Sequence, residues 1–224
     1  MTKKINIAID GPAGAGKSTV AKILAEHLEL LYIDTGSMYR ALTWKALQQS
    51  YDFENKTLIS ELSSKVVIKL YSNNKNYKVY IDGEDVTSEI RQPEVSQHVS
   101  LVAQIPKVRE NMVRQQQCIA ADGGVIMDGR DIGTNVLPAA CAKFFITASI
   151  EERALRRQRD LKENGYIISV DKLKEDIAER DFIDENREVD PLIPAKDAAI
   201  IDTTGLTIEQ VVEKMKNYVI ENCK

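Results

Sequence analysis

The sequence predicts an α/β fold with a central parallel sheet, and two observations carry this prediction. Short apolar runs alternate along the chain with stretches whose apolar residues recur at helical spacing. A β-rich stretch at residues 66–87 interrupts the alternation, and its NNKN and DG turns are typical of a small antiparallel sheet. With 224 residues and 43% hydrophobic content, the chain can bury one large core, so we expect a single domain over 1–224.

The first expected strand is a β-branched run, Ile5, Ile7 and Ile9, which suits a strand buried on both faces. A helix is expected after the glycines, because Val20, Leu24 and Leu28 recur at helical spacing. We expect further strands at 30–34, 125–128, 143–147 and 198–202, and helices at 93–120, 149–163 and 207–222. The β-rich stretch is then an insertion, or a spare sheet that merely extends the core.

Composition restricts the partners. The net charge is -4, so no surface-wide attraction to nucleic acid or to an anionic membrane is expected. Residues 1–10 hold no long apolar run and no cleavage site, and about 18 apolar residues never occur in succession, which favours a cytoplasmic protein. Cys118, Cys141 and Cys223 are odd in number and scattered, so we expect three reduced thiols.

The segment Gly11 to Ser18 has the spacing GxxxxGKS between an expected strand and an expected helix, which is the context of a phosphate-binding P-loop. Such a loop brings main-chain N–H groups and the positive end of a helix toward one anion. Lys17 is expected to reach the β and γ phosphates of ATP, and the Ser18 hydroxyl to bind Mg²⁺. The residues predicted to bind the donor are Gly11, Pro12, Ala13, Gly14, Ala15, Gly16, Lys17, Ser18 and Thr19.

Asp128 ends the apolar run VIM, where P-loop proteins commonly place a carboxylate beside the metal. We therefore predict that Ser18 and Asp128 hold Mg²⁺. The alternative is that Asp128 only forms the turn with Gly129.

A P-loop alone serves an ATPase, a GTPase switch or a kinase. No NKxD occurs, and the one DxxG, at 202–205, lies near the C-terminus, so a GTPase is disfavoured. Six of the eleven arginines lie between residues 153 and 187. They either form solvated ion pairs, with Glu151, Glu152, Asp176 and Asp184 as partners, or bind phosphate, which suits the guanidinium fork. Several arginines from separate segments indicate two phosphate-bearing substrates, and therefore an enzyme that transfers a phosphoryl group between them. The alternative is a regulatory nucleotide-binding module without turnover.

Five segments in order, IDGPAGAGKST, DTGSMYRA, DGRDIGT, the arginine-rich 151–160 and RDFIDENREVDPL, resemble bacterial-type cytidylate kinase over nearly the whole chain. The resemblance implies a P-loop three-layer fold with an antiparallel β insertion and a short helical lid. It also implies ATP-dependent phosphorylation of CMP and dCMP by a monomer. Kinases of the UMP/CMP or adenylate type are the alternative.

The resemblance also implies residue roles. Arg40, Arg130 and Arg187 would hold the acceptor phosphate, while Ser100, Arg109 and Asp131 would read cytosine. The alternatives for Asp131 are a contact with the sugar or the orientation of an arginine. The whole acceptor set is Thr35, Tyr39, Arg40, Ser100, Arg109, Arg130, Asp131, Arg180 and Arg187. The catalytic set is Lys17, Arg130, Arg153 and Arg157, and Arg157 also contacts ATP. The implied parts are a core at about 1–34, 105–150 and 188–224, a monophosphate-binding region at 35–104 and a lid at 151–167.

Overall fold

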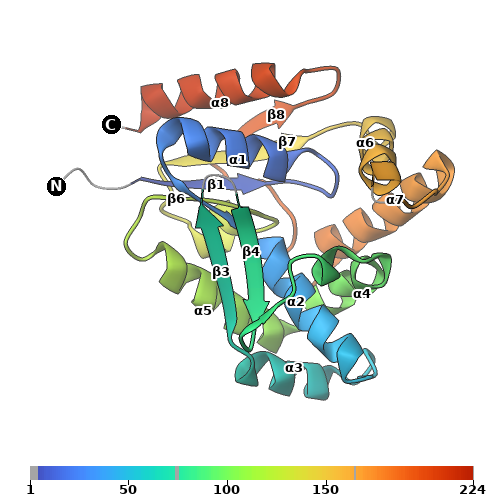
Figure 1. Cartoon of the computed structure of the whole chain (residues 1–224). Helices are drawn as coiled ribbons and strands as arrows, with labels where there is room; N and C mark the ends of the chain where they lie inside the picture. Colours follow the sequence, from blue (N-terminus) through green and yellow to red (C-terminus); the bar gives the residue numbers. More distant parts are fainter. Residues whose placement is uncertain (1–4, 74–75, 164, 224) are drawn as a thin grey trace.

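The computed structural model describes residues 5–73, 76–163 and 165–223, and shows a central sheet with helices on both faces (Figure 1). Residues 1–4 of the expected N-terminal segment, 74–75 of the expected NNKN turn and 164 of the expected lid lie outside this description. The strands of the central sheet are β1 (Asn6–Asp10), β2 (Leu31–Asp34), β6 (Val125–Gly129), β7 (Ala142–Thr147) and β8 (Ala199–Asp202). The helices are α1 (Lys17–Leu28), α2 (Thr35–Gln48), α3 (Lys56–Lys65), α4 (Pro93–Ala103), α5 (Pro106–Ala120), α6 (Ile150–Glu163), α7 (Val170–Asn186) and α8 (Ile208–Asn222).

The central sheet is parallel, with the strand order β2-β6-β1-β7-β8, which confirms the predicted α/β fold. Successive residues of β1 point to opposite faces, as the pleat of a strand requires. Ile7 and Ile9 pack in the cluster that contains α1 and α8, whereas Ala8 packs in the cluster on the α5 side. The continuous apolar run of β1 therefore reflects burial on both faces.

The carboxyl ends of β1, β2 and β6 meet at one edge of this sheet. Asp10 is in register with Gly129, and Asp34 with Asp128. The P-loop, the segment after residue 34 and the DGRD segment follow directly from these strand ends. The parallel topology thus brings together three motifs that are far apart in the sequence.

The predicted β insertion is confirmed as an antiparallel sheet of β3 (Ile68–Asn73), β4 (Asn76–Ile81) and β5 (Glu84–Asp85). Its second turn is Asp82–Gly83, and both residues have positive φ, as a tight hairpin turn requires. The sheet packs on α2 and beside β2 rather than extending the central sheet.

The helical stretch expected over 93–120 is two helices. α4 ends at Ala103 and α5 begins at Pro106. Proline lacks the N–H that would continue α4, but it suits the first turn of a new helix. The break therefore has a sequence signal, Pro106, that helical spacing alone overlooks.

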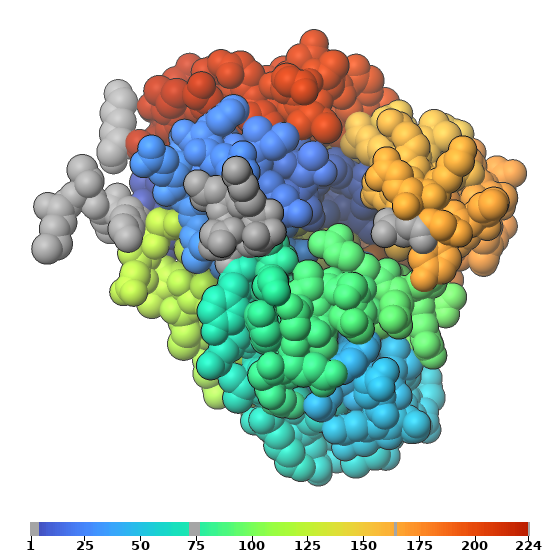
Figure 2. All heavy atoms as spheres, viewed as in Figure 1, coloured from blue at the N-terminus to red at the C-terminus, as the bar shows by residue number. Residues whose placement is uncertain are grey.

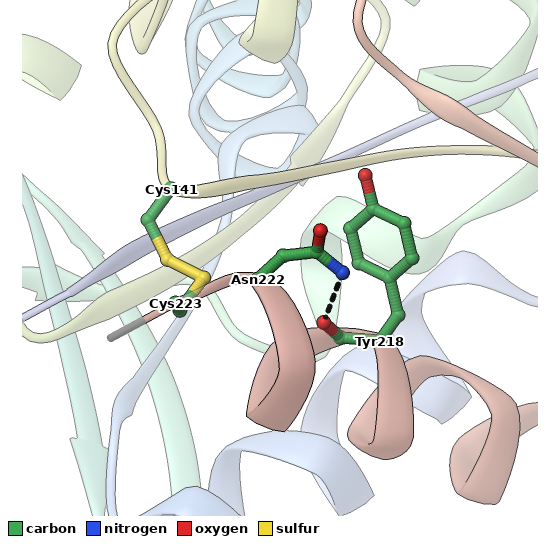
Figure 3. Close-up of a disulfide and its surroundings, with 4 residues drawn as sticks. All are labelled: Cys141, Tyr218, Asn222 and Cys223. Carbon is green, nitrogen blue, oxygen red and sulfur yellow. Dashed lines mark hydrogen bonds between the residues drawn. A yellow bond between two sulfur atoms is a disulfide. The ribbon is translucent and has the colours of Figure 1, made fainter.

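The expectation of three reduced thiols is wrong for two of them. Cys141, just before β7, forms a disulfide with Cys223, which follows α8, and their Cα atoms are 5.6 Å apart (Figure 3). Cys118 is free and exposed. The cysteines are 82 residues apart in sequence, so their spacing gave no sign that α8 would end beside β7. In the described part of the chain, no helix is both long enough and apolar enough to cross a membrane.

Candidate active site

The P-loop lies at the carboxyl end of β1 and leads into α1. Gly11 has a φ of 144°, and a Cβ there would overlap the main-chain oxygen of Ile146, so only glycine fits. The side chain of Lys17 is buried and donates a 2.7 Å hydrogen bond to the carbonyl oxygen of Pro12. Burial, reinforced by the nearby Arg130, lowers the pKa of Lys17. The lysine is thus held against the loop, inside a positively charged region.

Asp128 joins the P-loop to β6. One carboxylate oxygen accepts a 2.8 Å hydrogen bond from Ser18 Oγ, and the other accepts one of 2.8 Å from Tyr32 Oη. Burial raises the pKa of Asp128, and the neighbouring Asp34 raises it further. A buried carboxylate beside a P-loop hydroxyl supplies the oxygen donors that Mg²⁺ prefers, so these residues fit that ion.

The DGRD segment after Asp128 is held by Asp10, at the end of β1. The Asp10 carboxylate accepts hydrogen bonds of 2.8 Å and 2.7 Å from the main-chain N–H groups of Ile132 and Gly133. These residues open a π-helical turn, η2 (Ile132–Val136). Burial raises the pKa of Asp10 to about 6. Asp10 therefore fixes the main chain that carries the two functional candidates just before it, Arg130 and Asp131.

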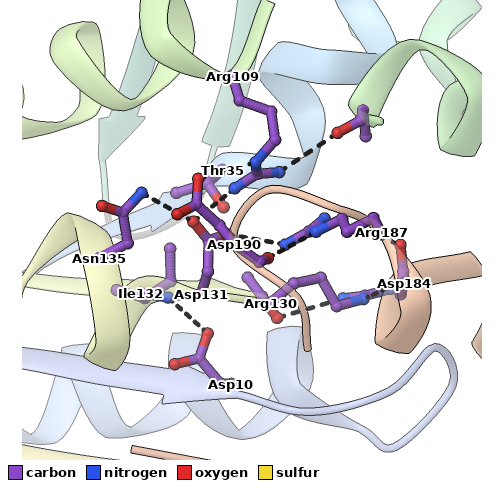
Figure 4. A network of polar contacts seen from close by, with 12 residues as sticks. Asp10, Thr35, Arg109, Arg130, Asp131, Ile132, Asn135, Asp184, Arg187 and Asp190 are labelled. Atoms are coloured by element: carbon purple, nitrogen blue, oxygen red, sulfur yellow. Dashed lines mark hydrogen bonds and ion pairs between the residues drawn. The ribbon is translucent and has the colours of Figure 1, made fainter. Parts of the chain in front are cut away.

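Asp131 is the centre of a buried polar network (Figure 4). Arg109 reaches it from α5 at 2.5 Å, and Arg187 reaches it from just beyond α7 at 3.4 Å. Asp190 joins both arginines, because its carboxylate accepts from Arg109 Nε at 3.0 Å and its carbonyl oxygen from Arg187 Nε at 2.6 Å. α7 ends at Asn186, and the backbone at Arg187 is already extended.

Tyr39 lines the same network. Its ring lies beneath the Arg109 guanidinium, 5.8 Å from ring centre to Cζ, and its hydroxyl is buried with no hydrogen-bond partner among the described residues. Ser100, on α4, is also buried, and Thr35 donates a 2.8 Å hydrogen bond to the main-chain oxygen of Asp128. A buried unpaired hydroxyl is costly unless a ligand satisfies it.

A second group of arginines gathers between this network and the P-loop. Arg130 donates to Asp184 at 2.8 Å, while Arg40 donates to the uncharged Ser96 hydroxyl at 2.8 Å. The Nε of Arg180 is buried with no hydrogen-bond partner in the described parts of the chain. Burial, then repulsion from Arg180 and Arg157, lowers the pKa of Arg40 to about 9. Burial and repulsion from Arg130 likewise lower the pKa of Arg180 to about 10.

Arg153 and Arg157 lie on α6, the helix within the expected lid at 151–167. Arg153 is buried, pairs with Asp181 of α7, and donates a 3.1 Å hydrogen bond to the carbonyl oxygen of Ala13 in the P-loop. Its neighbour Arg156 donates to Ala15 O at 3.3 Å. Arg157 instead belongs to the arginine group, because it acts on the pKa of both Arg40 and Arg180. In Figure 2 the surface is hollowed between the yellow and orange segment that holds α6 and α7 and the blue N-terminal part of the chain.

Sequence reasoning thus missed Asp10 and Asp190 as site residues, and treated Asp184 only as a pairing partner. Asp184 has a readable signal, since it stands between the two arginines of RDFIDENR. Asp10, the residue before the P-loop, has no local signal, because its partners are 122 and 123 residues away.

The fold and the site define a P-loop kinase. Structural neighbours agree at the level of the fold: a gluconokinase from Sinorhizobium meliloti has a TM-score of 0.50 at 13% identity, with 99% of this chain and 94% of that chain covered. An uncharacterised protein from Eubacterium ventriosum has a TM-score of 0.55 at 13% identity, over 98% of this chain and 99% of that one.

The particular family follows from sequence similarity. The cytidylate kinase family model matches residues 7–221. A cytidylate kinase from Desulforamulus reducens is 53% identical over 219 residues, and one from Bacillus anthracis is 51% identical over 220 residues, each match covering 98% of both chains. The chain belongs to the cytidylate kinase family and is a nucleoside monophosphate kinase, which confirms the resemblance and the predicted kind of enzyme.

Proposed function

We propose that the chain transfers the γ-phosphoryl group of ATP to the phosphate of CMP or dCMP, with Mg²⁺, to give ADP and CDP or dCDP. One observation carries this proposal. Arg130, Arg157 and Arg180 lie close enough to Arg40 to lower its pKa, yet Arg40 donates its hydrogen bonds to neutral groups, and Arg180 Nε is buried without a hydrogen-bond partner among the described residues. Buried guanidinium groups whose N–H donors meet neutral acceptors, or no acceptor in the described residues, favour bound phosphate groups.

The donor side consists of the P-loop residues, Lys17 and Arg157. Bound Mg²⁺ would be held by Ser18 and Asp128, where it would neutralise charge on the β and γ phosphates. Bound phosphates would favour the charged form of Lys17, which would then place its positive charge at the same phosphates. Arg153 acts one step further away, because its bond to Ala13 O holds the loop against the lid. We therefore assign Arg153 a positioning role within the predicted catalytic set.

The acceptor side consists of the arginine group and the Asp131 network. Arg40, Arg130 and Arg180 would hold the phosphate of CMP. Arg180 takes the role that the resemblance gave to Arg187, because Arg187 is paired with Asp131 and Asp190. Arg109, Asp131 and Ser100 would read the donor and acceptor groups of cytosine, with Tyr39 and Arg187 lining the same site. Asp184 keeps Arg130 oriented. Burial disfavours the charged form of Arg130, but the neighbouring Asp184 carboxylate raises the pKa of Arg130, so its guanidinium stays charged.

The chemistry needs alignment and charge neutralisation more than a base. A phosphate monoester is already an oxyanion at neutral pH, so it can attack the donor phosphorus without losing a proton. Lys17, Arg130 and Arg157 stabilise the charge that develops on the transferring group. A lid over 151–167 would exclude water, so that transfer to CMP outcompetes hydrolysis.

The predicted parts of the chain fit these roles. We propose a core of about 1–34, 105–150 and 188–224, a monophosphate-binding region of about 35–104, and the lid. We also propose that the enzyme acts as a monomer, because one chain supplies every residue of the site.

A coupled assay of ADP release with CMP, dCMP, UMP, AMP and dTMP as acceptors tests the proposal. We expect turnover with CMP and dCMP to exceed that with the other acceptors. Faster turnover with AMP or dTMP would contradict it, and faster turnover with UMP would favour the UMP/CMP type. ADP release that does not depend on any acceptor would contradict transfer altogether.

A further inference from the structure

The β insertion reaches the candidate active site through one side chain, Tyr77 of β4. Its hydroxyl accepts a 3.2 Å hydrogen bond from the main-chain N–H of Asp34, lies 3.2 Å from the carbonyl oxygen of the same residue, and lies 2.9 Å from Ser37 Oγ. Asp34 is the N-cap of α2, because its carboxylate accepts a hydrogen bond from Ser37 N–H. Tyr77 therefore contacts the point at which β2 ends and α2 begins.

The ring of Tyr77 also makes defined contacts. It packs against both the core of the monophosphate-binding region and the core beneath α1 and α8. It also lies beside the ring of Tyr32, with 5.6 Å between the two centres. Tyr32 in turn donates to Asp128. Tyr77 thus lies where the insertion, the central sheet and the start of α2 meet.

The start of α2 carries three predicted acceptor residues, Thr35, Tyr39 and Arg40. All three depend on the direction in which α2 leaves the sheet, since side chains on the first turns of a helix move with its N-terminus. Arg40 is already held from the other side by Ser96 of α4. Thr35 is tied to the sheet by its hydrogen bond to the main-chain oxygen of Asp128. The Tyr77 hydroxyl, bound to the N-cap residue, adds a constraint on this segment from the β insertion.

We propose that Tyr77 is a positioning residue for the acceptor: through its hydroxyl, the β insertion holds the N-terminus of α2 so that Thr35, Tyr39 and Arg40 meet the nucleoside monophosphate. The inference rests on the proposed function for its choice of acceptor. It also gives the β insertion a role. The insertion holds the acceptor-binding residues of α2 in place relative to the carboxyl ends of β1 and β6, which carry the donor-binding residues.

The variant Tyr77→Phe removes the hydroxyl and keeps the ring. Tyr71→Phe is the matched control, because Tyr71 is an exposed tyrosine on the neighbouring strand of the same sheet. In the coupled assay, the KM for CMP of Tyr77→Phe should rise about three- to tenfold, the range expected for a lost hydrogen bond. The KM for ATP should stay within about twofold, because the ring contact with Tyr32 is retained.

Hydrogen exchange of the unliganded protein supplies a readout that does not depend on activity. Amide exchange in the segment 34–40 should be faster in Tyr77→Phe than in wild type or Tyr71→Phe, while exchange in α8 stays the same. Unchanged exchange at 34–40, an unchanged KM for CMP, or an equal rise in the KM for ATP would each overturn the inference. A wild-type enzyme that does not use CMP would instead overturn the proposed function, and the exchange result would still decide whether Tyr77 holds α2.

Discussion

The guanidinium of Arg130 donates a hydrogen bond from Nε to Oδ2 of Asp184 at 2.8 Å, so a residue at the end of β6 is fixed by one on α7. Both side chains are largely shielded from water. Burial opposes the charge of Asp184, but Arg130 and Arg180 hold its pKa below the usual value. The pair therefore remains ionised. Because Nε is held by Asp184, the terminal nitrogens of the Arg130 guanidinium point in a fixed direction.

Arg130→Ala should impair use of CMP far more than binding of ATP. Loss of a fixed charge at a transferring phosphate costs about two to three orders of magnitude, so kcat/KM for CMP should fall by about 10²- to 10³-fold. The Kd for ATP, measured by calorimetry, should change by less than about threefold. Arg114→Ala is the control, since Arg114 is an exposed arginine on α5 paired with Glu110. Equal losses in CMP use and ATP binding would place Arg130 on the donor side instead.

Asp128→Asn should alter the dependence of activity on Mg²⁺. Asparagine keeps the size of the side chain but lacks the negative charge that favours a divalent ion beside Ser18. The Mg²⁺ concentration for half-maximal activity should rise by about tenfold or more, while the Kd for CMP stays close to that of wild type. Asp122→Asn, at an exposed position shortly before β6, should leave the titration unchanged. An unchanged titration in Asp128→Asn would favour the alternative that Asp128 only forms a turn.

Asp10 should make stability fall as the pH rises from about 4 to about 6. Its pKa is raised by burial from 3.8 to about 6, so the folded state binds the proton more tightly than the unfolded state. The stabilisation is fully present below the unfolded pKa and is lost as the pH rises through the folded one. Between pH 5 and pH 7.5 this amounts to about 1.4 kcal/mol from Asp10 alone.

Urea unfolding of wild type and Asp10→Asn at pH 5 and at pH 7.5 measures the contribution of Asp10 to the free energy of unfolding. The free-energy difference between the two proteins should shift by about 1.4 kcal/mol in favour of wild type at pH 5. A difference that is the same at both pH values would show that Asp10 does not titrate in this range.

The disulfide should be visible as a thiol count. Non-reduced, denatured protein should show one reactive thiol, Cys118, and reduced protein should show three. Closing a loop between residues 82 positions apart restricts the unfolded chain, so reduction should lower the free energy of unfolding by up to about 4 kcal/mol. Cys118→Ser should have the same stability as wild type, whereas three reactive thiols before reduction would contradict the pairing.

Much of the fold could be predicted because its signals are local. The run around Ile7 alternates between two buried faces, the glycine spacing of the P-loop needs eight consecutive residues, and the Asp82–Gly83 turn needs two. Each of these patterns is a direct consequence of backbone geometry. The strand order could not be read in the same way, because it depends on how the helices pack.

The candidate site was predictable only where a motif names its residues. Lys17, Ser18 and Asp128 belong to such motifs, and the structure brings them to one strand edge. The residues that hold them in place have no such signal. Asp10 and Tyr77 act through main-chain N–H groups far away in sequence, and every residue type except proline can offer such a group. Arg153 has a motif position, but its contact with Ala13 appears only in three dimensions.

The central claim is that the terminal phosphate of the donor goes to CMP rather than to water. Its most direct test is a single reaction of the wild-type enzyme with Mg²⁺, CMP and ATP labelled at the γ phosphate, separated by chromatography. We expect the label to appear in CDP, with little free phosphate and with no label transfer when CMP is omitted. Label released mainly as free phosphate, whether or not CMP is present, would contradict phosphoryl transfer to CMP.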